Sequence, residues 1–223
     1  MQEEIKTIRL ALPFKMGSVN CYLIETETGF ILIDTGGSNK RSELEKELEN
    51  AGCQPGSLKL IVLTHGDFDH TGNTAYVRQK FGTQIAMHPD DLGMVERGDM
   101  SWNREKGGLF LKRMAALLFG FGKSKRFTPD IYLDEGSDLT EFGFDAQVLS
   151  IAGHSMGSIG ILTASGDLFC GDLLENTRDP ALNSIMDDNS AASTSVEKLA
   201  GYEINTVYPG HGETFPMEQF VNK

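Results

Sequence analysis

The sequence contains little cysteine and no long apolar stretch. Its three cysteines, Cys21, Cys53 and Cys170, are an odd number without a CxxC pair, which indicates a reducing compartment rather than a disulfide framework. No run of about 18 uncharged apolar residues is present, so no transmembrane helix is predicted. The N-terminal stretch MQEEIKTIRLALPFK opens with acidic residues, whereas a signal peptide begins with basic ones. We therefore expect a cytoplasmic protein.

Basic residues are also scarce. Lys and Arg number 20 against 32 Asp and Glu, which gives a net charge of -12. Attraction to a phosphate backbone needs a basic surface, so nucleic acid is not the expected partner. We expect a small-molecule substrate instead. The 223 residues contain no linker, low-complexity tract or short repeat, and we expect a single domain over residues 1–223.

Apolar periodicity predicts strands and helices in alternation. Alternating residues up to position 34 indicate antiparallel hairpins, and LKLIVL, which ends at Thr64, indicates a strand buried on both faces. We expect helices at 39–51, with a capping box of Ser42 and Glu45, and at 71–81, ended by Gly82. A second group of strands is expected at 144–151, 158–163 and 168–171. This pattern indicates an α/β fold.

Histidine and aspartate gather where apolar strands end. THGDFDH places His65, Asp67, Asp69 and His70 within six residues, and two further histidines follow in AGHS (His154) and PGHG (His211). Alternate residues of an extended loop point the same way, so His65 and Asp67 can share one ion while Asp69 and His70 reach a second. Asp172, in CGDLL, offers a carboxylate that could bridge both ions. Imidazole with carboxylate suits zinc, iron or manganese, and we expect two divalent metal ions.

These motifs resemble the metallo-β-lactamase superfamily of metallohydrolases. The resemblance runs from LIDTG through THGDFDH, GHSMGS and CGD to YPGHG, in the order and approximate spacing of that family. It implies a four-layer αβ/βα sandwich, with two sheets face to face and helices outside. It also implies a role for each matching residue: His65 and His154 bind the first metal, Asp69, His70 and His211 the second, Asp172 bridges, and Asp34 supports the ligands from behind.

One position departs from the family pattern. The usual motif is His-x-His-x-Asp-His, whereas this chain has Asp67 in place of the second histidine. An additional carboxylate ligand lowers the formal charge of a dinuclear site and favours iron or manganese over zinc. We therefore predict that Asp67 is a metal ligand, either directly or through one water.

The predicted centre supports hydrolysis through a metal-bridging hydroxide, with Asp69 orienting the nucleophile and passing its proton to the leaving group. Ester, thioester, lactone and phosphodiester bonds all remain open. Two alternatives are a non-heme di-iron protein that reduces oxygen or nitric oxide with a separate electron donor, and a sensor that keeps its metal without turnover.

The segment at about 89–130 interrupts the alternation of strands and helices. It contains a predicted amphipathic basic helix, whose apolar face comprises Phe110, Met114, Leu117, Leu118 and Phe121. We leave four roles open for this helix: packing against the core, a homodimer contact, a lid over the substrate, or binding at a membrane interface. As a lid it would bind anionic substrates through Lys123, Lys125 and Arg126. Tyr208 is a further candidate for substrate contact, with core packing as its alternative.

Overall fold

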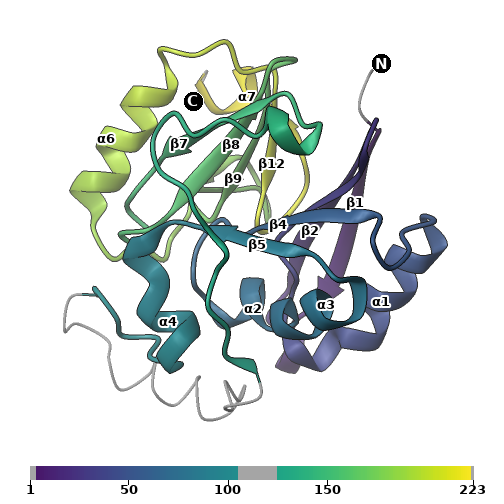
Figure 1. The fold of residues 1–223 in the computed structure, drawn as a ribbon. Coiled ribbons are helices and arrows are strands. Elements are labelled where there is room, and N and C mark those ends of the chain that lie inside the picture. The colour runs from purple at the N-terminus through teal and green to yellow at the C-terminus, as the bar shows by residue number, and fades with distance from the viewer. Residues whose placement is uncertain (1–3, 105–124, 222–223) are drawn as a thin grey trace.

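The computed structural model describes residues 4–104 and 125–221 (Figure 1). One sheet consists of β1 (Glu4–Ala11), β2 (Ser18–Thr26), β3 (Gly29–Ile33), β4 (Leu58–Val62), β5 (Gln84–Met87) and β6 (Ile131–Tyr132), in that order. A second sheet has the order β13 (Phe215–Pro216), β12 (Thr206–Pro209), β9 (Asp167–Gly171), β8 (Ile159–Thr163) and β7 (Ala146–Ser150). A separate antiparallel pair consists of β10 (Leu174–Glu175) and β11 (Ala181–Leu182).

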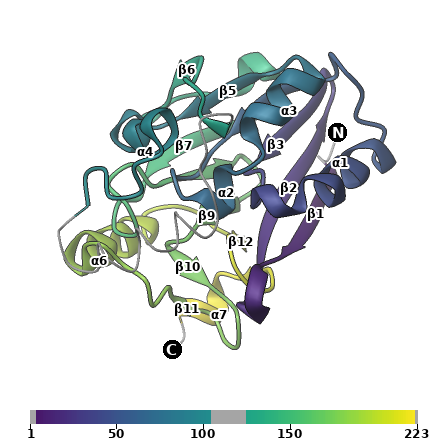
Figure 2. The same ribbon diagram turned by 90° about the horizontal axis from the view of Figure 1, so that it is seen from below.

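Helices connect and flank the strands of the two sheets. They are α1 (Arg41–Asn50), α2 (Phe68–Thr71), α3 (Thr74–Phe81), α4 (Leu92–Arg97), α6 (Asn189–Leu199) and α7 (Glu218–Val221). Short 3-10 turns occupy Pro13–Lys15, Ser38–Lys40, Pro89–Asp91 and Thr140–Phe142. Helices α1 and α3 cover the first sheet and α6 covers the second (Figures 1 and 2).

Three apolar layers hold these elements together. Ile33 and Val62 of the first sheet meet Ile161 and Phe169 of the second in the central layer. A second layer packs the first sheet against α1 and α3, and a third packs the second sheet against α6. The result is the four-layer αβ/βα sandwich that the resemblance implied. It explains why strands such as LKLIV are apolar along their length, because helices cover one face of the sheet and the other sheet covers the opposite face.

The two expected helices in the first half form, with changed boundaries. Helix α1 starts at Arg41 after Lys40, whose side chain makes no capping hydrogen bond, so the capping box predicted for Ser42 and Glu45 is wrong. The Glu45 carboxylate instead accepts hydrogen bonds from Tyr76 and Lys80 of α3. The expected helix at 71–81 is divided into α2 and α3. Gly82 ends α3 in the left-handed conformation, as predicted.

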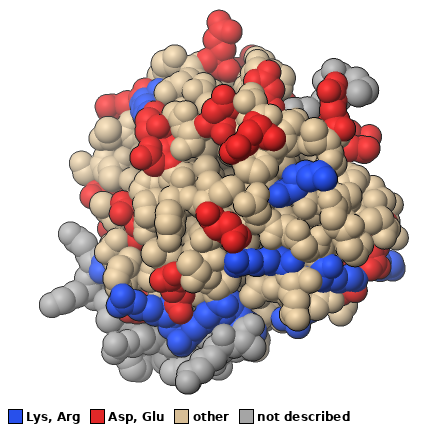
Figure 3. Space-filling model, viewed as in Figure 1, with Lys and Arg blue, Asp and Glu red and all other residues tan. Residues whose placement is uncertain are grey.

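The segment at about 89–130 begins with the Pro89–Asp91 turn and α4, and its predicted amphipathic helix lies outside the described residues, as does Lys123. Lys and Arg side chains gather on the lower half of the face shown in Figure 3, and Asp and Glu dominate the upper half. Among residues 4–104 and 125–221, no helix has the length and apolar character that crossing a membrane requires.

Candidate metal centre

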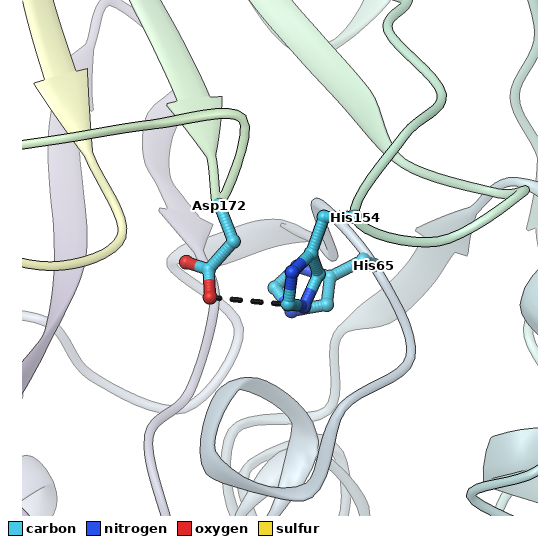
Figure 4. Close-up of side chains that lie close together, drawn as sticks. All are labelled: His65, His154 and Asp172. Atoms are coloured by element: carbon cyan, nitrogen blue, oxygen red, sulfur yellow. Dashed lines mark ion pairs between the residues drawn. The ribbon is translucent and has the colours of Figure 1, made fainter. Parts of the chain in front are cut away.

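Six of the seven predicted ligands form two groups at one edge of the sandwich. His65 follows β4, His154 follows β7 and Asp172 follows β9, and these three side chains converge (Figure 4). The second group comprises Asp69 and His70 of α2 with His211, which follows β12. Because His70 Nε2 of α2 lies 3.4 Å from both Asp172 Oδ1 and His211 Nε2, residues from both halves of the chain meet there.

The Asp172 carboxylate faces histidines of both groups. Its Oδ2 lies 3.2 Å from His211 Nε2 and 3.8 Å from His154 Nε2, and its Oδ1 lies 3.4 Å from His70 Nε2. Two ligand atoms that share a tetrahedral zinc ion are about 3.4 Å apart, given bonds of about 2.1 Å. These separations therefore suit a carboxylate that bridges two ions.

Each of the four histidines has its Nδ1 atom held by an oxygen. His70 Nδ1 donates to Asp34 Oδ2, His154 Nδ1 to the Ile185 carbonyl and His211 Nδ1 to the Ser18 carbonyl, at 2.7 to 2.8 Å. His65 Nδ1 lies 3.0 Å from Thr64 Oγ1. A proton fixed on Nδ1 directs the lone pair of Nε2 toward the centre, as in histidines that bind metals.

Asp34 supports two of these histidines at once. Its Oδ2 binds His70 and also accepts from Thr64 Oγ1, while its Oδ1 accepts from the Thr64 amide. Thr64 in turn contacts His65, so one carboxylate behind the site orients a ligand of each group. Asp34 has a φ of 59°, in the left-handed region that a non-glycine residue adopts at a cost.

Buried carboxylates and unpaired acceptor atoms make the centre favourable for a cation. His65 Nε2 and Asp172 Oδ1 are buried without a hydrogen-bond partner in the described structure. Burial on its own lowers the pKa of His70, but Asp172, Asp34 and Asp69 outweigh it and raise that pKa to about 10. The pKa of His211 likewise rises to about 9, against the effect of burial, because Asp172 is adjacent. Divalent cations fit this donor set, since they satisfy the orphaned atoms and the carboxylates together.

Metal binding is therefore expected to release protons at neutral pH. Below their raised pKa values His70 and His211 carry protons that must leave before Nε2 can bind a metal, so affinity should rise with pH up to about 10. Calorimetric titration in two buffers of different ionisation enthalpy measures the number released. A His88→Asn variant is the control, because His88 instead caps the Pro89–Asp91 turn. Metal affinity that is constant between about pH 6 and pH 9 would contradict this expectation.

Asp67, the seventh predicted ligand, lies beside the first group with an arginine attached. Its Oδ2 lies at hydrogen-bond distance from His154 Nε2, 2.8 Å, and 3.7 Å from His65 Nε2, so an ion bound by these two histidines would lie next to this carboxylate. Arg104 Nη1 donates to its Oδ1 at 2.8 Å. Burial on its own raises the pKa of Asp67, but Arg104 and His154 hold it well below its usual range. Its side chain does not cap α2.

A cleft of about 520 Å³ opens over the centre. Its floor contains members of both ligand groups, and its apolar wall comprises Leu12, Met16, Phe68 and Ile185. The other candidates for substrate contact that the structure describes lie elsewhere. Tyr208 stacks on Phe169 in the layer between the sheets, and Lys125 Nζ donates to Ser38 Oγ. Neither of these two residues nor Arg126 lines the described cleft.

Three supporting residues have no signature in the sequence. Asp91 is fully buried and accepts from the Gly66 and Gly157 amides and from Ser155 Oγ. Arg104 binds Asp67 from a position 37 residues further along the chain.

Asn20 is the third of these residues, and it supports the turn that carries His211. Its Nδ2 donates to the carbonyls of Pro209 and Gly212, at 3.0 and 2.9 Å. Gly210 in this turn has no space for a side chain, since a Cβ atom there would lie 2.2 Å from Asp172 Oδ1. The glycine of the PGHG motif is thus explained by close approach of the backbone to a ligand.

Comparison with known proteins identifies the family of the chain. The sequence model of the metallo-beta-lactamase superfamily matches residues 15–211. The chain therefore belongs to the metallo-β-lactamase superfamily, and its relatives place it among the metal-dependent hydrolases of that superfamily.

Two curated relatives and one solved structure illustrate the similarity. Hydroxyacylglutathione hydrolase GloC of Haemophilus influenzae is 30% identical over 169 residues, 73% of this chain and 70% of that protein. The probable metallo-hydrolase MJ0888 of Methanocaldococcus jannaschii is 27% identical over 203 residues, 88% of each chain. The crystal structure of TTHA1623 in a di-iron-bound form superposes with a TM-score of 0.72 at 28% identity, over 95% of each chain.

Proposed function

We propose that this protein hydrolyses an acyl bond, a thioester, ester or lactone, at a centre of two divalent metal ions. The observation that carries the proposal is the pair of ligand groups that share the Asp172 carboxylate at the floor of a 520 Å³ cleft. His65 and His154, with Asp67 beside them, would hold one ion. Asp69, His70 and His211 would hold the other.

When bound, two such ions lower the pKa of a water molecule and polarise the scissile carbonyl. The chain supplies orientation and a proton carrier. Asp69 lines the cleft, and its Oδ2 lies 3.6 Å from His211 Nε2. Burial raises the pKa of Asp69, which suits a carboxylate that orients the attacking water and then delivers a proton to the leaving group.

The charge of the cleft favours acyl substrates over phosphodiesters. Arg9 is the sole lysine or arginine among the described residues that line it. Both oxygens of Glu213 bind the Arg9 guanidinium, at 2.6 and 2.7 Å, so this cation is already neutralised. Glu175 adds a negative charge to the lining outside the ligand groups. An anionic phosphodiester would meet that charge, whereas a neutral acyl group would not. The name of the relative GloC, a hydroxyacylglutathione hydrolase, also specifies an acyl substrate.

A substrate panel tests the proposal. Protein expressed with zinc, iron and manganese supplied would be assayed against thioesters, lactones, carboxylic esters and phosphodiesters, beside an Asp69→Asn variant. We expect turnover of at least one acyl class, loss of turnover on chelation and recovery on adding metal back. The variant should lose about 100-fold or more in kcat, the scale of general acid and base catalysis. A protein that holds two metals yet hydrolyses no acyl substrate would contradict the proposal.

A di-iron redox protein is the second candidate. Asp67 adds a carboxylate beside the first ligand group, and the TTHA1623 structure is of a di-iron-bound form. Oxygen uptake under a reductant, measured on the iron-loaded protein, distinguishes the two. Rapid uptake without acyl hydrolysis would favour the redox function.

A further inference from the structure

Arg104 is a buried cation placed directly against the first ligand group. Its side chain is 4% exposed, and its guanidinium joins two carboxylates. Nη1 and Nη2 bind Oδ1 and Oδ2 of Asp67, at 2.8 and 2.9 Å, in the bidentate arrangement that arginine forms with carboxylates. Nε lies 2.7 Å from Asp187 Oδ2. The three residues form a charged chain behind the histidines.

Oxygen Oδ2 of Asp67 has two competing partners. It accepts from Arg104 Nη2 and is also the atom that faces His154 Nε2 and His65 Nε2, at 2.8 and 3.7 Å. For an ion held by the two histidines and Asp172, this oxygen is the nearest further carboxylate ligand. The guanidinium fork already occupies one lone pair of each Asp67 oxygen, so the ion would share Oδ2 with a positive charge.

The second ligand group has a different environment. Among the described residues, Asp69, the carboxylate of that group, forms ion pairs with histidines alone, and no lysine or arginine takes part. Two divalent ions are therefore not equivalent in this protein. The ion on the His65 side has a fixed guanidinium charge behind its carboxylate, and repulsion between like charges is strong where water is largely excluded.

We propose that Arg104 competes with the metal for Asp67, so that the Asp69, His70 and His211 group fills first and the His65 and His154 group binds its ion more weakly. Arg104 is in this view a positioning residue that sets the order of metal loading. The inference rests on the proposed two-metal function. A simpler role is that of a tether, because Asp187 belongs to the loop whose amides bind the Gly153 carbonyl next to His154.

Stepwise metal binding separates competition from tethering. Metal-free protein would be titrated with Zn²⁺ in competition with a chromophoric chelator, and with Co²⁺ followed by its absorption spectrum. We expect two dissociation constants that differ by about tenfold or more in the wild type, and Arg104→Ala should tighten the weaker one by about tenfold while leaving the tighter one within about twofold. Arg104→Lys retains the charge and should retain weak binding.

Asp187→Asn provides the matched variant. It removes the negative charge that partly neutralises Arg104, so competition predicts that the second metal ion binds more weakly, with a larger dissociation constant. This change is opposite in direction to that expected for Arg104→Ala. A tether predicts the same sign for both variants, since each breaks the chain that links Asp67 to the 187 loop. In an Asp67→Asn background, Arg104→Ala should change metal affinity much less, because Arg104 and the metal ion no longer compete for a carboxylate at position 67.

Each outcome decides the question. Equal affinities in the wild type, or weaker binding in Arg104→Ala, would overturn the role of Arg104 while leaving the two-metal hydrolase intact. A wild type that binds one metal or none would overturn the proposed function itself. If Arg104→Ala does not fold, the wild-type difference in affinity and the sign of the Asp187→Asn effect still test the inference.

Discussion

Replacing Asp172 with alanine is expected to empty both metal positions and to reduce hydrolysis by more than about 100-fold, the upper end of the loss seen when a residue that merely supports a ligand is removed. The expectation follows from its position, since its two oxygens face His70, His154 and His211. No other described carboxylate touches histidines of both groups. Without it, each group keeps fewer ligands and loses the charge that offsets a cation.

Elemental analysis and thioester or lactone hydrolysis on the same preparation measure this prediction. Asp167→Ala is the control, because Asp167 starts the same strand, β9, and its carboxylate accepts from Ser165. That variant should keep its metal content and activity. Two metals per chain in Asp172→Ala would show that the carboxylate does not bridge, and would require each group to bind its ion independently.

The convergence of the candidate ligands was predictable because these residues follow the ends of strands. His65, His154, Asp172 and His211 each follow an apolar run that forms a buried strand, and parallel strands deliver their ends to one edge of a sheet. Order and spacing of the motifs were sufficient to assign the superfamily. The helix boundaries were less predictable, since Ser42 and Glu45 match a capping box by spacing alone and Glu45 is used in contacts with α3.

The supporting residues were not predictable from spacing or periodicity. Arg104 meets Asp67 across 37 positions, and Asp91 meets Gly157 across 66, in both cases between loops without a regular pattern. This matters for the charge of the centre. Counting ligands in the motif adds the negative charge of Asp67, but only the folded chain reveals that Arg104 pairs with it. Preference for iron or manganese therefore cannot be derived from the extra carboxylate alone.

Asp91 links the two loops that carry the first ligand group. Gly66, between His65 and Asp67, donates its amide to Asp91 Oδ2 at 2.8 Å, and Ser155, next to His154, donates its hydroxyl to the same oxygen at 2.7 Å. Gly157 donates to Oδ1 at 3.0 Å, and a Cβ atom on Gly157 would lie 2.7 Å from the Asp91 carboxyl. The two loops are thus held against one buried carboxylate.

Asp91→Ala is therefore expected to lower the free energy of unfolding by about 3 to 5 kcal/mol, because each buried donor left without an acceptor costs about 1 to 3 kcal/mol. The Ser155 hydroxyl can turn to Ser158 Oγ, 2.8 Å away, which limits its share of the loss. Metal affinity should fall as well, since the spacing of His65 and His154 depends on the same contacts. Urea denaturation of metal-free protein measures the first effect and chelator competition the second.

Asp90→Ala, at the adjacent half-exposed side chain, should change stability by less than about 0.5 kcal/mol. If Asp91→Ala is as stable as the Asp90 variant and binds metal as tightly as the wild type, the two loops are held by their own backbone and not by this carboxylate.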